Sequence, residues 1–416
     1  MGLIIVSFVG VLLQTTATTA AQFTIGRFIS FAMTGMTIVV VPIYQAETAP
    51  KALRGLITSS LQMMILLGSL VASLVTWGTS SMKTNAGWQI PVGLQFFAPT
   101  ALLILWFWVP ESPRWDALGQ SSCRGSYCIS SPNPKRQVRT GHRTRDPSHS
   151  TRPLDRSKGK WSDLFDAKNR ARTMVDILAM FGQQITGQAF ASQYAAIFYQ
   201  SQGFGDRSFV FFVITSVFRL VCLLITWFTI DLIGRRVLLL NGGSAMAIIL
   251  FIVGSTGTLP NPTDTQKNTL VAAFMLYASS YSLSWAPISY VVLSEAASSH
   301  IKEKTNLIAS AISVLTTFVT SFTLPYLLHK GYAGRGAKVG FIYGSICVAM
   351  VVLAYFFIPE LKGRSLEEFG QLFASGQPFR KLGKLKTQTA EERLEGILRM
   401  NPGIRSSRHW GNEQLS

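Results

Sequence analysis

Charged side chains are scarce in this sequence. Only 14% of its 416 residues are charged, whereas ordinary soluble domains carry about 25%. Hydrophobic residues make up 48% of the chain, and acidic residues are the rarest charged class, with 20 Asp and Glu against 38 Lys and Arg. A soluble core cannot absorb so much apolar surface. The composition therefore excludes an ordinary soluble globular domain.

The sequence also lacks the motifs of catalysis and metal binding. Its four cysteines show no metal-ligand spacing, and two of them, Cys222 and Cys347, lie inside apolar runs where packing is the expected role. No nucleotide-binding loop and no nucleophile motif is present. We therefore expect no enzyme, no catalytic residue, no cofactor and no bound metal.

What the chain does contain is long apolar runs. A bilayer core of about 30 Å needs about 20 mostly apolar residues per helix. Ten runs reach that length, over residues 2–21, 23–44, 56–78, 89–109, 175–199, 209–230, 237–256, 270–293, 307–328 and 339–357. Their Gly, Ala and Ser content favours packed helices over the alternating pattern of a membrane barrel. The first run lacks the basic leader of a signal peptide, so we count it as a span.

The net charge of +18 follows membrane topology rather than nucleic-acid binding. If the spans alternate in direction, 30 of the 38 Lys and Arg lie on one side of the membrane. The positive-inside rule makes that side cytoplasmic and places both termini there. The predicted regions are a four-span bundle at 1–110, a basic irregular cytoplasmic loop at 111–170, a six-span bundle at 171–360 and a cytoplasmic tail at 361–416.

An internal repeat relates the two bundles. Glu47 precedes Glu111 by 64 residues, and Glu295 precedes Glu360 by 65, each acid lying at a span end. Asp231 precedes Glu295 by 64 residues, but the matching position before Glu47 would fall upstream of Met1. The repeat therefore predicts a six-plus-six architecture of which this chain carries ten spans. We expect a chain of ten spans to insert poorly and two further upstream spans to restore function.

Acids and bases recur together at the span ends of the basic side. Such groups can pair across helices where desolvation is partial, and the pairs can act as a gate. The alternative is that they serve only as interfacial anchors and topology signals. The predicted gating network comprises Glu47, Arg54, Glu111 and Arg114 in the first bundle and Asp231, Arg235, Arg236, Glu295, Lys302, Glu360 and Arg364 in the second.

Together these motifs resemble those of the sugar porters of the major facilitator superfamily, over nearly everything except about 116–160 and the distal tail. The resemblance rests on motifs that appear in the family's order at span ends: Gly26-Arg27, Pro42-x-Tyr44-x-x-Glu47 with Arg54-Gly55, Pro110-Glu111-Ser112-Pro113-Arg114, Gln183-Gln184-x-x-Gly187, Asp231-x-x-Gly234-Arg235-Arg236 and Pro359-Glu360-x-Lys362-Gly363-Arg364. The sequence around Tyr290 resembles that of fungal hexose or α-glucoside permeases more than that of other members of the family. The implied fold is an all-α helical bundle in which two halves enclose a central site.

Amide and phenol side chains inside the apolar spans are the candidate sugar contacts. An amide offers both donors and acceptors to sugar hydroxyls without a charge, although helix-to-helix hydrogen bonding is the alternative role. The resemblance implies sugar contact for Gln62 and Gln183. The full candidate set is Gln62, Gln183, Gln184, Gln188, Tyr194 and Tyr290, and we expect Pro287 to break the eighth span beside it. Arg219 lies mid-span with no obvious acidic partner, and either faces the cavity or marks a drifted sequence.

The resemblance implies transport of a hexose or an α-glucoside by alternating access. The expected partners are a sugar, a co-transported proton and the lipid bilayer, with no nucleic acid, for a monomer in the plasma membrane. Two alternatives stay open: a transporter-like sugar sensor, and a truncated transporter without function.

Overall fold

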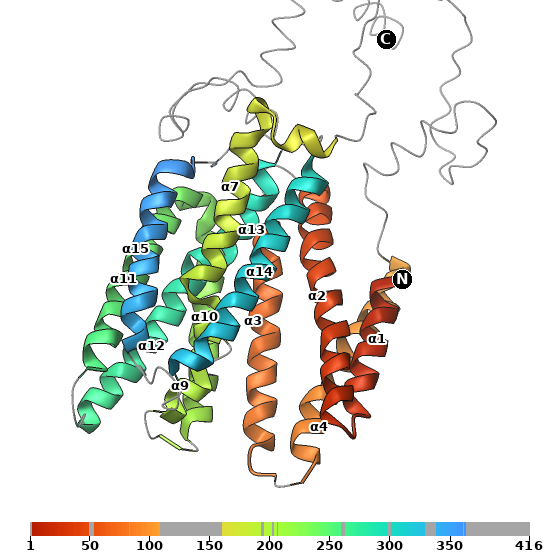
Figure 1. The fold of residues 1–416 in the computed structure, drawn as a ribbon, viewed down its shortest axis with the longest axis vertical. Helices are drawn as coiled ribbons and strands as arrows, with labels where there is room; N and C mark the ends of the chain where they lie inside the picture. The colour runs from red at the N-terminus through yellow and green to blue at the C-terminus, as the bar shows by residue number, and fades with distance from the viewer. Residues whose placement is uncertain are drawn as a thin grey trace, which may run out of the picture.

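The computed structural model describes residues 2–49, 54–82, 84–108, 160–192, 195–201, 204–205, 207–258, 263–297, 301–328, 338–360 and 362. Within these ranges the regular structure is helical, and the helices run roughly side by side (Figure 1). Seven of the described helical segments are long and apolar enough to cross a membrane. The all-α membrane fold expected from the apolar runs is confirmed.

The first region contains four apolar segments. They are α1 (Gly2–Thr15), α2 (Ala20–Thr48), α3 (Arg54–Thr79) and a final segment built from α4 (Ala86–Gly93), η2 (Leu94–Phe96), α5 (Phe97–Leu105) and η3 (Trp106–Trp108). The first run ends six residues earlier than expected, because Thr19 caps the start of α2 by accepting a hydrogen bond from the backbone N–H of Gln22 at 3.3 Å. An uncharged threonine-rich turn therefore separates α1 from α2.

The second region begins with a short 3-10 turn, η5 (Trp161–Leu164), and contains six segments. The first is interrupted and consists of α7 (Ala167–Gln183), η6 (Gln184–Gln188), α8 (Ala189–Ser192) and α9 (Ala195–Ser201). The others are α10 (Arg207–Ile233), α11 (Arg235–Thr256), the pair α12 (Asp264–Leu283) and α13 (Trp285–Ala296), α14 (Lys302–Leu328) and α15 (Val339–Phe357). The last of these has the same limits as the expected tenth run.

The break between α12 and α13 lies at Ser284, within the turn that precedes Pro287 and that a proline disrupts, as expected. Ser284 has a non-helical backbone, with φ −125° and ψ −91°. Pro287 then falls in the first turn of α13, where a backbone N–H has no helical acceptor and a proline costs little. The Leu283 carbonyl oxygen, four residues before the proline, accepts instead from the Thr226 hydroxyl at 3.0 Å, so the break is the one that Pro287 imposes.

The main hydrophobic core lies inside the second region. Aromatic rings fill it: Phe190, Phe198, Phe274, Tyr277 and Trp285 are fully buried. Around them α11 packs against α12 and α15, and α7 packs against α13 and α14. Figure 1 shows α11, α12 and α15 grouped on the side of the molecule away from α1 and α2.

A smaller core joins the two regions. Leu61 of α3 packs with Met180 of α7, Leu293 of α13 and Ala309 of α14, and Ile38 of α2 contacts this group. The helices α3 and α10 also lie against each other, as do α2 and α14. We call the end of the bundle where α3, α7, α11 and α14 begin the charged end, because Asp231, Arg235, Glu295, Lys302 and Glu360 lie there.

Candidate functional site

The break in α7 is built around a glycine. Gly187 has a φ of +112°, a left-handed conformation that favours glycine, and a Cβ there would lie 2.0 Å from the Tyr277 hydroxyl oxygen. The α-helical ladder is lost over 184–188, where the turn widens to a π-helix. The Tyr277 hydroxyl donates to the freed carbonyl oxygens of Thr186 at 2.9 Å and Gly187 at 3.1 Å. The break is therefore a stable feature with satisfied backbone groups.

Gln183 occupies the last residue before this break and is 2% exposed. Its Nε2 donates to the carbonyl oxygen of Ala286 at 2.8 Å, just past the break between α12 and α13. Its Oε1 accepts from Gln184 Nε2 at 3.2 Å, and the Tyr290 hydroxyl also bonds the Gln183 side chain. One amide thus links the two interrupted segments of the bundle.

Gln184 extends the same network toward α14. Its Nε2 donates to the Ser313 hydroxyl at 3.1 Å, while its Oε1 is buried without a hydrogen-bond partner in the described structure. The structure therefore brings together Gln183, Gln184 and Tyr290. A buried amide oxygen without a donor is costly, so this oxygen has an unused acceptor position that suits a ligand hydroxyl or a water.

The other candidate contacts are less connected. Gln62 is buried on α3, next to Leu61 of the joining core, and its Nε2 donates to no described residue. Gln188 is half-buried, and its Oε1 likewise accepts no hydrogen bond from the described residues. Tyr194 lies outside the described residues.

Arg219 does not lie between the two regions. It is buried inside the second region, at 1% exposure, where its Nε donates to the Ser282 hydroxyl at 3.3 Å and its Nη1 points to the Ala191 carbonyl oxygen at 3.5 Å. Its Nη2 has no hydrogen-bond partner among the described residues. Its position among α8, α10 and α12 ties it to the internal packing of the second region.

Arg235 is the hub of the charged end. Its Nη2 lies 2.7 Å from Asp231 Oδ1, one helical turn away, and 2.9 Å from Glu295 Oε1 on α13. The side chains of Arg235 and Glu295 are almost fully buried, whereas Asp231 is one-third exposed. Breaking a buried pair by removing one partner leaves an uncompensated charge, so these three groups act as a unit.

Glu360 caps the start of α11. Its two carboxylate oxygens accept from the backbone N–H groups of Arg235 at 3.0 Å and Arg236 at 3.2 Å. Gly234, with a φ of +104°, leaves no room for a side chain, since a Cβ there would lie 2.8 Å from Glu360 Oε2. A carboxylate at the N-terminal end of a helix also complements the helix dipole. The side chain of Arg236 has a different acceptor: its Nη2 donates to the Tyr355 carbonyl oxygen at 2.6 Å.

The first turn of α3 rests directly on the group formed by Asp231, Arg235 and Glu295, which we call the charged unit. A Cβ at Gly55 would lie 2.5 Å from Asp231 Oδ1 and 2.8 Å from Arg235 Nη2. One residue on, the Leu56 carbonyl oxygen accepts from the Trp227 indole of α10 at 2.6 Å. The Gly55 backbone and the Trp227 indole therefore hold the two regions together at the charged end.

Several predicted gating residues cannot be placed. Glu111, Arg114 and Arg364 lie outside the described residues, and so do the side chains of Glu47 and Arg54. Lys302 is buried at the start of α14. Of the predicted network the structure thus brings together Asp231, Arg235 and Glu295, with Glu360 and Arg236 next to them.

Residue patterns did not single out every member of these networks. Ser313, Tyr277 and Trp227 are ordinary residues of apolar runs, and only their contacts across helices mark them. Gly55 belongs to the Arg54-Gly55 motif. A glycine at that position was the available signal that another group approaches the backbone closely.

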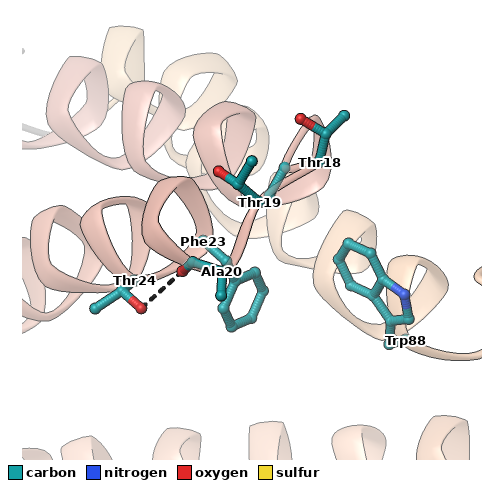
Figure 2. Close-up of a pocket in the computed structure, with 7 residues that line it drawn as sticks. Thr18, Thr19, Ala20, Phe23, Thr24 and Trp88 are labelled. Atoms are coloured by element: carbon teal, nitrogen blue, oxygen red, sulfur yellow. Dashed lines mark hydrogen bonds between the residues drawn. The ribbon is translucent and has the colours of Figure 1, made fainter.

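A shallow hollow lies elsewhere, at the turn between α1 and α2. It is lined by Ala17, Thr18, Thr19, Ala20, Phe23, Thr24 and Trp88. Figure 2 shows the Phe23 and Trp88 rings beside the threonine-rich turn, with the Thr24 hydroxyl bonded to the Ala20 carbonyl oxygen at 2.8 Å. None of the candidate sugar contacts is among these residues.

Comparison with known families gives one match over most of the chain. The family model described as "Sugar (and other) transporter" matches residues 1–373. Among curated proteins, the low-affinity glucose transporter HXT1 of Saccharomyces cerevisiae is 31% identical over 375 residues, which cover 85% of this chain and 64% of that protein. The high glucose sensor RGT2 of the same yeast is 30% identical over 367 residues, covering 84% of this chain and 47% of that protein. The chain thus spans less than two thirds of the length of these relatives.

Solved structures share the fold. The proton:xylose symporter XylE bound to 6-bromo-6-deoxy-D-glucose has a TM-score of 0.67 at 20% identity, covering 89% of this chain and 82% of that chain. A double tryptophan mutant of XylE gives a TM-score of 0.69 with the same coverage. With the motifs, the helical architecture and the family match in agreement, the chain belongs to the sugar transporter family of the major facilitator superfamily, a family of membrane transporters and not of enzymes.

Proposed function

We propose that this protein carries a sugar, a hexose or an α-glucoside, across a membrane by alternating access. The observation that supports this most is the linked pair Gln183 and Gln184 at the break in α7, with the Gln184 Oε1 buried and free of a donor in the described structure. Uncharged amides at an interrupted helix suit a neutral ligand rich in hydroxyl groups. Gln62 of α3 would complete the site from the first region.

The distribution of Lys and Arg along the chain supports one orientation of the protein in the membrane. The positive-inside rule assigns the charged end and both termini to the cytoplasm, and a plasma-membrane location suits a sugar carrier. In this proposal residues 1–110 and 171–360 form the two membrane bundles, 111–170 the cytoplasmic loop and 361–416 the cytoplasmic tail. The working unit is a monomer.

The gate in this proposal is the contact between α3 and the charged unit. With Gly55 seated on Asp231 and Arg235, and Trp227 bonded to Leu56, the cytoplasmic ends are packed together. Opening toward the cytoplasm separates α3 from α10 and removes these contacts. The central site then faces the cell interior.

Co-transport of a proton is part of the proposal. XylE, which shares the fold, is described as a proton:xylose symporter, and that activity belongs to XylE. In this chain, a proton gradient would drive sugar uptake if a carboxylate binds a proton in one state and releases it in the other.

The second candidate function is sugar sensing. It is favoured by the 30% identity to the glucose sensor RGT2. A sensor binds sugar and changes conformation without net flux. Measuring flux therefore separates the two functions.

The test is uptake of radiolabelled glucose and maltose in cells that lack their own carriers for these sugars. Where the protein reaches the membrane at normal abundance, we expect saturable uptake, and a higher KM in Gln183→Ala and Gln62→Ala because each loses binding energy common to all states. The control is Gln89→Ala, since Gln89 is exposed at the far end of the bundle. Sugar binding without uptake would favour the sensor. Unchanged KM in both variants at normal abundance would remove the proposed site.

The gate has its own test. Glu295→Gln removes one carboxylate from Arg235, so we expect the cytoplasmic ends to separate more often. Labelling of a cysteine at Thr58, a buried position on α3, by a reagent applied from the cytoplasmic side would then speed up. Glu303→Gln, an exposed acid on α14, is the matched control. Equal labelling in parent and Glu295→Gln would contradict the gate.

A further inference from the structure

A buried carboxylate lies in α7 that neither the sugar site nor the charged unit uses. Asp176 is fully buried, and neither of its carboxylate oxygens accepts a hydrogen bond from any residue that the structure describes. An ionised carboxylate in such surroundings is strongly disfavoured, because burial removes water and no donor among the described residues replaces it. A group of this kind either binds a proton or holds a ligand.

The helix facing Asp176 supplies a second buried polar group at the same level. Both α7 and α14 start at the charged end, and the Gln184 to Ser313 hydrogen bond fixes their register. Asp176 precedes Gln184 by about two helical turns, and Asn306 precedes Ser313 by the same number of turns. Asn306 is fully buried, and neither of its amide atoms has a hydrogen-bond partner among the described residues.

Two cations act on Asp176 from a distance. They are Lys302, at the first turn of α14, and Arg172, one turn earlier on α7. The other ionisable groups on the elements packed against α7 are Asp163 of η5, Tyr290 and Glu295 of α13, Glu303, Lys304 and Tyr326 of α14, and Tyr343, Cys347 and Tyr355 of α15. The helix α15 carries no Asp, Glu, Lys, Arg or His. Lys302 and Arg172 are thus the charges that act on Asp176. Two cations beside the carboxylate disfavour a third, so a proton fits this position better than a metal cation.

Asp176 is also connected to the joining core and the sugar site. Asp176, Met180 and Gln183 follow one another on one face of α7 at helical spacing, so Asp176 lies about 10 Å from Gln183 along the axis. Met180 packs in the joining core with Leu61 of α3, and Ile177 contacts that core. Separating the cytoplasmic ends would therefore open the surroundings of Asp176 to water.

We propose that Asp176 is a proton-binding site that holds its proton while the two regions are packed together at the charged end, and releases it to water when they separate. The proton leaves the carboxylic acid for cytoplasmic water, and the carboxylate that remains is stabilised by Lys302 and Arg172. The role of this site in driving sugar uptake rests on the proposed function. The site itself does not.

The first test is chemical modification of the purified full-length protein. Dicyclohexylcarbodiimide adds to a protonated carboxyl group in an apolar setting and is read out by peptide mass spectrometry. We expect labelling of Asp176 at low pH and its loss as the pH rises, by about tenfold per pH unit once the ionised form dominates. Glu295, which is bonded to Arg235, is the internal control and stays unlabelled. Absence of label on Asp176 at every pH would overturn the proposal.

The second test links the proton to the packing of the two regions. In a background without the native cysteines, Met180→Cys reports separation through its reaction with a membrane-impermeant maleimide. We expect labelling to rise several-fold with pH in this parent and to stay low in Asp176→Asn, which mimics the protonated acid. Glu303→Gln should keep the parent response. The same pH response in Asp176→Asn as in the parent would contradict the proposal.

Neither readout requires sugar or flux. Loss of uptake with intact, pH-dependent modification of Asp176 would refute the transport function and leave the proton site standing. Uptake together with unmodified Asp176 would refute the proton site alone.

Discussion

The two membrane regions achieve packing by different means. In the second region, α11 and α15 each have 39% of their most apolar 18-residue stretch buried, and aromatic rings interlock in the core. In the first region the corresponding share is 6% for α2 and 11% for the segment Ala86–Leu105. In contrast, α3 reaches 33%, because it packs on α10 and α13. Apolarity qualifies a segment for the membrane, but lipid is itself apolar, so burial depends on partners rather than on hydropathy.

Close contact in the first region comes from small residues and one amide. A Cβ at Gly10 would lie 2.6 Å from the Ser30 hydroxyl oxygen, and one at Gly26 would lie 3.1 Å from the Gly10 carbonyl oxygen. Between these helices Gln14 Nε2 donates to the Gly26 carbonyl oxygen at 3.2 Å and to Ser30 Oγ at 2.7 Å. The backbones of α1 and α2 therefore pack directly against each other, whereas the second region is stabilised by the packing of large side chains.

The largest expected difference between the regions is the cost of removing a phenylalanine. Phe274 is 0% exposed, and its ring centroid lies 4.8 Å from Phe198 and 4.9 Å from Phe190. We expect Phe274→Ala to lose about 3 kcal/mol through the cavity it leaves. Phe28 of α2 is 76% exposed, so Phe28→Ala should change stability by about 0.5 kcal/mol or less. Unfolding of the purified protein in detergent, followed by circular dichroism, measures both. Similar losses would show that the regions are packed alike.

Alanine substitutions of two glycines should change the stability in opposite directions, and by less than Phe274→Ala does. Gly187→Ala places a Cβ in a left-handed conformation against the Tyr277 hydroxyl, so it should cost about 1 to 3 kcal/mol. Gly35 lies within α2 with open space around its Cα. Gly35→Ala should therefore stabilise the protein by about 0.5 to 1 kcal/mol through helix propensity. The same unfolding measurement applies. Stabilisation by Gly187→Ala would mean that the α7 break is not imposed by that glycine.

The fold was largely predictable because each apolar run carries its own signal. The run at 339–357 coincides with α15, whose apolar sequence is uninterrupted. The breaks were harder to predict. Pro287 located the break between α12 and α13 to within one turn. The non-helical residue itself, Ser284, is marked by no local residue preference.

The candidate site was predictable where a polar residue stood alone in an apolar run. Gln183 and Gln184 meet that description, and so does Arg235 at a span end. Their partners were not predictable, since the Ala286 carbonyl oxygen and Ser313 are ordinary groups that only the tertiary structure brings within 2.8 and 3.1 Å. Asp176 was visible in the sequence as an acidic residue within an apolar run. It belongs to none of the family motifs, so the family resemblance gave it no role.

The smallest expected effect concerns the amide between α1 and α2. Gln14→Leu keeps the volume of the side chain but removes its hydrogen bonds to Gly26 and Ser30. Hydrogen bonds between membrane helices contribute about 0.6 kcal/mol on average, so we expect a loss of about 1 kcal/mol. The control is Gln89→Leu at an exposed position, and unfolding in detergent is again the measurement. Because glycines already bring the two backbones together, Gln14 should adjust their contact rather than create it. A loss as large as that of Phe274→Ala would show instead that the first region depends on this one polar side chain.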